Sequence, residues 1–88
     1  MDLRQIVTEL LDRGEKCILL NMAEVSYMDS GGLGDLVVSF VKASRRNGQL
    51  KLLNLNDKLD DVLEMTHLID VFGHFSDETE AVNSFDTD

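Results

Sequence analysis

The sequence predicts an α/β fold with a small, mainly parallel sheet and helices packed on it. Apolar stripes with a helical period alternate with short, continuous apolar runs, and glycine or polar residues separate them. The 88 residues contain no proline and no repeat, so one domain covering residues 1–88 is expected. Strands separated by helices of about 10–15 residues imply right-handed crossovers and therefore parallel pairing.

Four helices and three strands are expected in strict alternation, beginning with a helix. The helices are predicted at residues 3–12, 31–46, 57–66 and from 76 onward, and the strands at 16–21, 50–55 and 71–75. The first strand reads as buried on both faces, although it could form an unprotected edge of the sheet. Three positions carry specific expectations: a buried thiol at Cys17, a left-handed helix stop at Gly48, and a last helix that turns Ala81, Val82 and Phe85 inward.

The composition excludes several classes of function. Seventeen acidic residues against eight basic ones give a formal charge of −9, which repels nucleic acid and anionic lipid. The longest apolar run is far shorter than the roughly 18 residues of a membrane span, so membrane insertion is not expected. The single cysteine cannot form an internal disulfide, and a cytoplasmic location is therefore expected.

The most informative segment joins the first strand to the second helix and reads Tyr-Met-Asp-Ser-Gly-Gly-Leu-Gly from Tyr27 to Gly34. Ligands of α/β proteins gather at such junctions. Ser30 lies at or next to the N-cap, where its hydroxyl is expected near the surface, aimed at the unpaired amides of the first turn. A phosphate on this hydroxyl would meet those amides and the positive end of the helix dipole. The pattern suits a serine that a partner protein modifies; the alternative is that Asp29 or Ser30 serves only as a helix cap.

Catalytic and cofactor motifs are not completed by these glycines. A dinucleotide fingerprint fails at Val37, a P-loop fails after Gly34, and a nucleophile elbow would need glycine in place of Met28. The two histidines, His67 and His74, are distant from the motif and are expected to be structural, with no metal bound. The acidic residues Asp57, Asp60 and Asp61 are expected to form a solvated helix start. Neither enzymatic activity nor a cofactor is expected.

The segment resembles the signature of the STAS domain family, which includes the bacterial anti-sigma-factor antagonists. The resemblance covers nearly the whole chain, from Leu3 onward. It is carried by Asn21 and the motif at 27–34, continues through Leu52-Leu53-Asn54, the helix with Val62-Leu63 and residues 68–72, and ends with the acidic helix at 77–85. It implies that Ser30 is phosphorylated by a serine kinase of the histidine-kinase-like ATPase fold, which is also the anti-sigma factor, and that Asp29 is the supporting carboxylate. It further implies that the unphosphorylated protein binds this kinase and releases a sigma factor, and that a PP2C-type phosphatase reverses the modification. The residues implied to bind the partner are Tyr27, Met28, Asp29, Ser30, Gly31, Gly32 and Leu33.

Two features and two alternatives accompany the resemblance. Gly31 stands where the family often has serine, so Ser30 is expected to be the only hydroxyl in the motif. Family members usually carry strands ahead of the first helix, and this sequence shows none there, so an uncovered apolar face and self-association into a homo-oligomer are expected. The alternative functions are an accessory or scaffold module of a transport or stress-signalling complex, and a sensor of a small ligand such as a nucleotide or anion.

Overall fold

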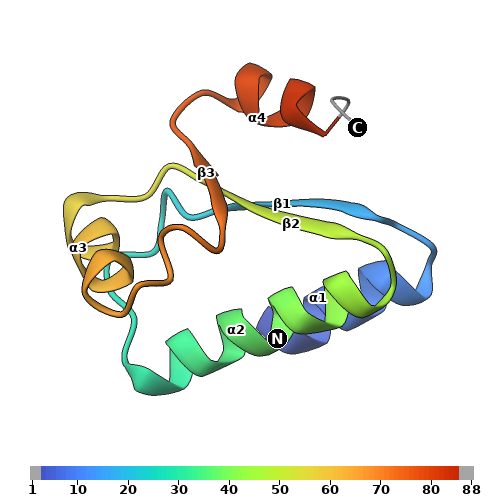
Figure 1. Ribbon diagram of the computed structural model, residues 1–88, viewed down its shortest axis with the longest axis horizontal. Coiled ribbons are helices and arrows are strands. Elements are labelled where there is room, and N and C mark those ends of the chain that lie inside the picture. The colour runs from blue at the N-terminus through green and yellow to red at the C-terminus, as the bar shows by residue number, and fades with distance from the viewer. Residues whose placement is uncertain (1–2, 86–88) are drawn as a thin grey trace. The chain divides into compact units, whose positions relative to one another are not determined.

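The computed structural model describes residues 3–85, and this part of the chain contains the expected four helices and three strands in alternation (Figure 1). The helices are α1 (Leu3–Asp12), α2 (Ser30–Arg45), α3 (Asp57–Met65) and α4 (Glu78–Ser84), and the strands are β1 (Cys17–Asn21), β2 (Gln49–Leu53) and β3 (Gly73–Phe75). Predicted and observed boundaries differ by two residues or fewer. The α/β class is confirmed.

The three strands form one sheet in the order β1-β2-β3. β2 and β3 are parallel, with Lys51 opposite Gly73 and Leu53 opposite Phe75. β1 therefore lies at an edge, and the prediction that it is buried on both faces is wrong, since only Ile18 within it is buried. Cys17 is exposed, contrary to the prediction of a packed thiol, because it is the first residue of an edge strand with a neighbour on one side only.

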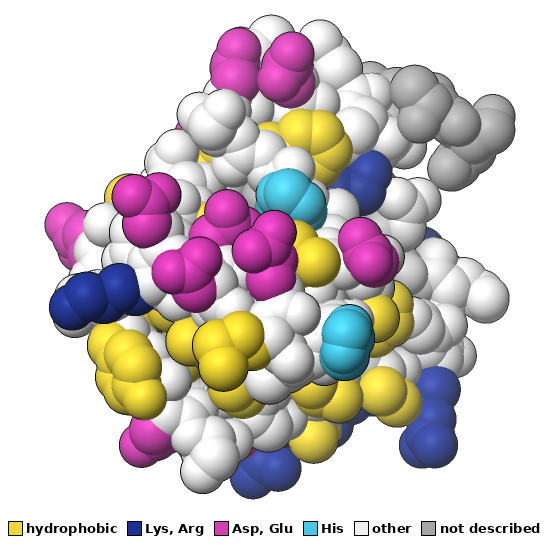
Figure 2. Space-filling model, turned by 60° about the vertical axis from the view of Figure 1, so that its left-hand side comes forward, with side chains coloured by type: hydrophobic (Ala, Val, Ile, Leu, Met, Phe, Trp, Pro, Cys, Tyr) yellow, Lys and Arg dark blue, Asp and Glu magenta, His cyan; other side chains and the backbone are white. Residues whose placement is uncertain are grey.

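The chain divides into two compact units. The first unit comprises Met1–Ile18 and Met28–Leu50, and the second comprises Leu19–Tyr27 and Lys51–Asp88. The first unit contains six basic and six acidic residues, whereas the second contains two basic and eleven acidic residues. The whole formal charge of −9 therefore belongs to the second unit. Figure 2 shows acidic side chains gathered on the face of the molecule on which α3 comes forward. The expectation of a single domain stays a prediction.

The first unit is built on α1 and α2, which lie side by side (Figure 1). Polar contacts join the two helices along their length: Arg4 Nε lies 3.2 Å from Asp35 Oδ1, and Arg46 Nη1 lies 2.6 Å from Asp12 Oδ1. Lys42 Nζ also donates to Thr8 Oγ1 at 3.0 Å. The buried side chains of the two helices are Val7, Leu11, Leu36, Ser39 and Ala43.

Ser39 is an unfavourable feature of this core. Its side chain is fully buried, and its Oγ has no hydrogen-bond partner. A buried polar group without a partner costs about 1–3 kcal/mol. We therefore expect Ser39→Ala to raise the free energy of unfolding by about 1 kcal/mol, measured by urea denaturation. Ser44→Ala, at an exposed position of the same helix, is the matched control and is expected to change little. A loss of stability in Ser39→Ala would contradict this account of the hydroxyl.

The turn between α2 and β2 corrects the prediction for Gly48. Asn47, and not Gly48, adopts the left-handed conformation, with φ 61°. Gly48 is required for a different reason: a Cβ there would lie 2.9 Å from Lys16 O and 3.1 Å from Ala43 O. The chain is thus closely packed backbone against backbone at this turn, where Gly48 N donates to Ala43 O and Gln49 N donates to Lys16 O, both at 2.7 Å.

The second unit is organised around Lys51 of β2. Its Nζ donates to Ser84 Oγ at 2.7 Å and lies 4.6 Å from the centroid of the Phe85 ring and 5.8 Å from that of Phe75. A cation over aromatic faces is attracted by the ring quadrupoles. These contacts attach the end of α4 to β2 and β3. The buried side chains of the unit are Met22, Leu52, Leu53, Leu59, Leu63, Phe72, Ala81 and Phe85.

The last helix begins later than expected and turns fewer residues inward. Asp77 is its N-cap, and Asp77 Oδ1 accepts from Thr79 N at 2.9 Å. Ala81 and Phe85 are buried as predicted, but Val82 is 50% exposed, so that part of the prediction is wrong. In a helix of seven residues the buried stripe is narrow, and Val82 lies beside it. Among residues 3–85, no helix has the length and apolar character needed to cross a membrane.

Candidate functional site

The start of α2 is organised by Asp29. This residue is the N-cap, with φ −87° and ψ −175°, and its Oδ1 accepts from Gly32 N at 2.9 Å. Its carbonyl oxygen accepts from Leu33 N at 3.0 Å, which closes the first turn. Ser30 is the first residue of the helix, next to the N-cap as predicted, and the aim of its hydroxyl at the first-turn amides stays a prediction. The Asp29 carboxylate takes one of these amides, that of Gly32, because an N-cap side chain reaches the amide two or three residues ahead.

The predicted partner-binding residues are largely accessible. Asp29, Ser30 and Gly31 are exposed, and Tyr27 is 63% exposed. The remaining three, which are half-buried, are Met28, Gly32 and Leu33. The seven residues are consecutive in sequence. The boundary between the two units falls between Tyr27 and Met28.

The glycines of the motif leave room for the cap. A Cβ at Gly31 would lie 3.3 Å from Asp29 Oδ1, and one at Gly32 would lie 3.4 Å from the Cβ and Cγ of Met28. The first of these distances is tighter than ordinary van der Waals contact. Glycine at position 31 thus leaves the Asp29 carboxylate uncrowded beside Ser30. The two residues that follow Ser30 carry no side chains that could cover it.

The two acidic residues nearest to Ser30 in sequence, Asp29 and Asp35, differ in their partners. Asp35 pairs with Arg4 at 3.2 Å, which compensates its charge on a half-exposed surface. The Asp29 carboxylate accepts from the backbone amide of Gly32, and Asp29 directly precedes Ser30. A phosphate on Ser30 would add about −1.5 to −2 charge at pH 7 next to this carboxylate. Negative charge added at Ser30, in the first turn of α2, is therefore opposed most closely by the carboxylate of Asp29.

The segment leading to Tyr27 is held by asparagines that the sequence analysis did not identify as site residues. Asn21 Oδ1 accepts from Ala23 N at 3.0 Å and from Asn54 Nδ2 at 3.2 Å. Asn56 Nδ2 donates to the carbonyl oxygens of Val25 and Ser26, at 3.0 and 3.3 Å. The sequence offered one sign of these residues, because each ends or follows a strand. Polar side chains are common there, however, and the sequence nearby does not show which distant groups they bind.

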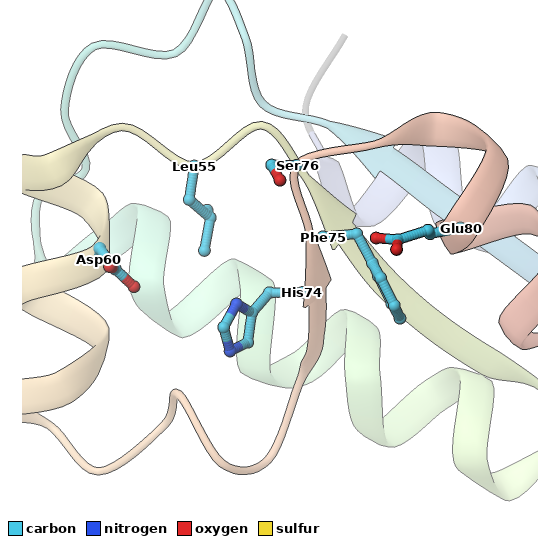
Figure 3. Close-up of a pocket in the computed structure, with 6 residues that line it drawn as sticks. All are labelled: Leu55, Asp60, His74, Phe75, Ser76 and Glu80. Atoms are coloured by element: carbon cyan, nitrogen blue, oxygen red, sulfur yellow. The ribbon is translucent and has the colours of Figure 1, made fainter.

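A separate pocket of about 360 Å³ opens where β2 and β3 end (Figure 3). His74 and Phe75 point to opposite sides of β3, as neighbouring residues of a strand do. His74 is exposed and lines the pocket. Two carboxylates in the lining disfavour anions such as nucleotides. The lining residues are Leu55, Asp60, His74, Phe75, Ser76 and Glu80.

No group of three or more histidine, cysteine, aspartate or glutamate side chains within residues 3–85 is arranged to hold an ion. His67 adopts φ 61° in the turn after α3, where it is exposed.

Comparisons with known proteins agree on a family. The model of the STAS domain family matches residues 2–81. An anti-sigma-B factor antagonist of Staphylococcus aureus (strain NCTC 8325 / PS 47) is 36% identical over 80 residues, which cover 90% of this chain and 72% of the relative. An anti-sigma-B factor antagonist of Bacillus subtilis (strain 168) is 36% identical over 69 residues, which cover 78% of this chain and 62% of that protein.

Solved structures support the same fold. The crystal structure of a candidate anti-sigma factor antagonist from Thermotoga maritima has a TM-score of 0.85 at 27% identity, covering 92% of this chain and 70% of that one. A STAS domain protein from Planctomyces limnophilus has a TM-score of 0.78 at 20% identity, covering 97% of this chain and 77% of that one, and this likeness concerns the fold alone.

Proposed function

The chain belongs to the STAS domain family, and from this we propose that it is an anti-sigma-factor antagonist whose binding to its partner is switched by phosphorylation of Ser30. The observation that carries the proposal is local: Asp29 caps α2, so that Ser30 is exposed at the first helical position and is not needed as the cap. Relatives at 36% identity named anti-sigma-B factor antagonists support the role.

In this proposal the partner is an anti-sigma factor that is also a serine kinase of the histidine-kinase-like ATPase fold. The unphosphorylated chain binds it through the surface from Tyr27 to Leu33, and a sigma factor is released. The kinase supplies the nucleotide, so this chain needs neither a cofactor nor catalytic groups of its own. A PP2C-type phosphatase removes the phosphate and restores binding.

The physical basis of the switch is a contact surface that fits a neutral hydroxyl. In the free protein, a phosphate on Ser30 meets the first-turn amides and the positive end of the helix dipole, which contribute roughly 0.3–1 kcal/mol. In the complex the same phosphate is removed from water beside Asp29, and like charges in contact cost several kcal/mol. The phosphate is thus tolerated by the free chain and opposed in the complex.

Phosphorylation itself is the first test. The chain is incubated with ATP and the anti-sigma-B factor of Staphylococcus aureus, and intact and fragment masses are recorded. We expect one phosphate, located on Ser30, which is lost in Ser30→Ala and retained in Ser26→Ala, an exposed serine four residues earlier. The Staphylococcus aureus relative serves as the positive control. An unmodified chain alongside a modified relative, or a phosphate located on Ser26, would overturn the proposal.

A further inference from the structure

The side chain of Asn56 serves two parts of the second unit at once. Its Oδ1 accepts from Leu59 N at 2.8 Å and caps α3. Its Nδ2 donates to Val25 O at 3.0 Å and to Ser26 O at 3.3 Å, across 31 and 30 positions of sequence. An asparagine amide offers two N–H donors and a carbonyl acceptor. Both donors and the acceptor are engaged, so the orientation of the group is determined by its partners.

The two carbonyls that Asn56 holds lie directly before Tyr27. Tyr27 is the first residue of the surface proposed to bind the partner, and it is 63% exposed. An exposed aromatic ring is a good anchor at an interface only if it is presented in one orientation, because ordering a mobile segment on binding costs affinity. The clamp from Asn56 restrains the chain at the two residues that precede the ring.

The same contact shapes a hollow on the surface. A pocket of about 380 Å³ lies between the held segment and the start of α3, and it is lined by Ser26, Asn56, Asp57 and Lys58. The hollow, Tyr27 and α3 belong to one compact unit. A partner that contacts Tyr27 therefore meets a hollow within the same compact unit.

We propose that Asn56 is a positioning residue of the partner-binding surface, and that this surface extends from Tyr27 over the hollow to the start of α3. The inference rests on the proposed function, in that the protein occupying the surface is the anti-sigma factor. Asn56 itself acts through the backbone of Val25 and Ser26.

Asn56→Asp separates the two roles of the side chain. Aspartate is as good an N-cap as asparagine, so the cap on α3 is retained. Its carboxylate cannot donate, and it opposes the carbonyl oxygens of Val25 and Ser26. The matched control is Asp77→Asn, the reverse exchange at the N-cap of α4, where the side chain holds only the Thr79 amide.

The mobility of the segment can be read without any partner. The sequence has one tyrosine and no tryptophan, so its intrinsic fluorescence reports on Tyr27 alone. We expect time-resolved anisotropy to show a more mobile Tyr27 in Asn56→Asp, which stays folded with a lowered midpoint of thermal unfolding because two hydrogen bonds are lost. Asp77→Asn is expected to change neither quantity. Unchanged anisotropy in a folded Asn56→Asp would overturn the positioning role.

Binding is measured by titration against the anti-sigma-B factor of Staphylococcus aureus. Asn56→Asp is expected to weaken binding about tenfold. When it is made in a chain that already carries Tyr27→Ala, it should weaken binding little further, because both substitutions act through the Tyr27 side chain. Ser26→Met, which fills the hollow, is expected to weaken binding severalfold, whereas Ser26→Ala does not. Full affinity in Asn56→Asp, or in Ser26→Met, overturns the corresponding half of the inference. A wild-type chain that fails to bind overturns the proposed function, and the fluorescence measurement still decides whether Asn56 holds the segment.

Discussion

Ser30→Asp is expected to bind the anti-sigma factor at least a hundredfold more weakly than Ser30→Ala, which should bind like the unphosphorylated wild type. The aspartate places a permanent negative charge at the first position of α2, directly after the carboxylate of Asp29. The neighbouring Asp35 contributes less, because Arg4 lies 3.2 Å from it. Alanine removes the hydroxyl without adding charge, and it is a good helix residue at this exposed position.

The size of the effect follows from the change of surroundings on binding. Each 1.4 kcal/mol corresponds to a tenfold change in affinity. Desolvating a charge beside a like charge at an interface costs several kcal/mol, so affinity is expected to fall by at least two factors of ten. The free protein gains roughly 0.3–1 kcal/mol from an added anion at the helix start, so folding should not be impaired. The switch therefore needs no change of fold.

The measurement is a pair of titrations against the anti-sigma-B factor of Staphylococcus aureus at two salt concentrations. Thr79→Asp is the matched control, since it adds the same charge to the exposed first turn of another helix, α4. It is expected to retain binding, which separates a local charge effect from one of net charge. Equal affinities for the two Ser30 variants would contradict the electrostatic switch.

Alanine substitutions at Gly48 and Gly34 are expected to change stability in opposite directions. At Gly48 a new Cβ meets the backbone oxygens of Lys16 and Ala43 at 2.9 and 3.1 Å. Both oxygens accept hydrogen bonds at this turn, so neither can move without loss. Inserting a group into a closely packed place costs about 1–3 kcal/mol. For a chain of this size each kcal/mol lowers the unfolding midpoint by roughly 4–8 °C.

Gly34 is the matched control, because it lies within α2 and a Cβ there would have no atom within 4 Å. Glycine inside a helix costs roughly 0.5–1 kcal/mol relative to alanine, so Gly34→Ala should stabilise the chain by about that amount. Thermal and urea denaturation of both variants provide the comparison. A neutral Gly48→Ala would show that the turn between α2 and β2 is looser than its distances indicate.

The order of the elements and the motif could be read from the sequence because both depend on neighbours along the chain. Apolar residues recur at helical spacing in α1 and α2, and the motif around Ser30 places an acidic cap, a hydroxyl and glycines in consecutive positions. Hydrophobic period and short motifs are properties of a single segment. They are therefore visible before any folding is considered.

The errors concern positions whose surroundings come from elsewhere in the chain. The apolar run containing Cys17 was consistent with a buried strand, but the strand order put it at an edge. The stop after α2 was expected to require a left-handed glycine, but Asn47 took that conformation and Gly48 was needed for its approach to Lys16. Burial and close approach depend on which segments meet, and a local pattern does not contain that information.

By itself, the sequence determined the succession of helices and strands, the strongly acidic charge and an exposed serine next to an acidic helix cap. Only the tertiary structure decided that Asn56 holds the chain before Tyr27, and that the net negative charge belongs to the unit containing α3 and α4. The physical reason is range. Helix periodicity and capping act over three or four residues, whereas the bonds of Asn56 join groups 30 and 31 positions apart, and only the folded chain brings these together.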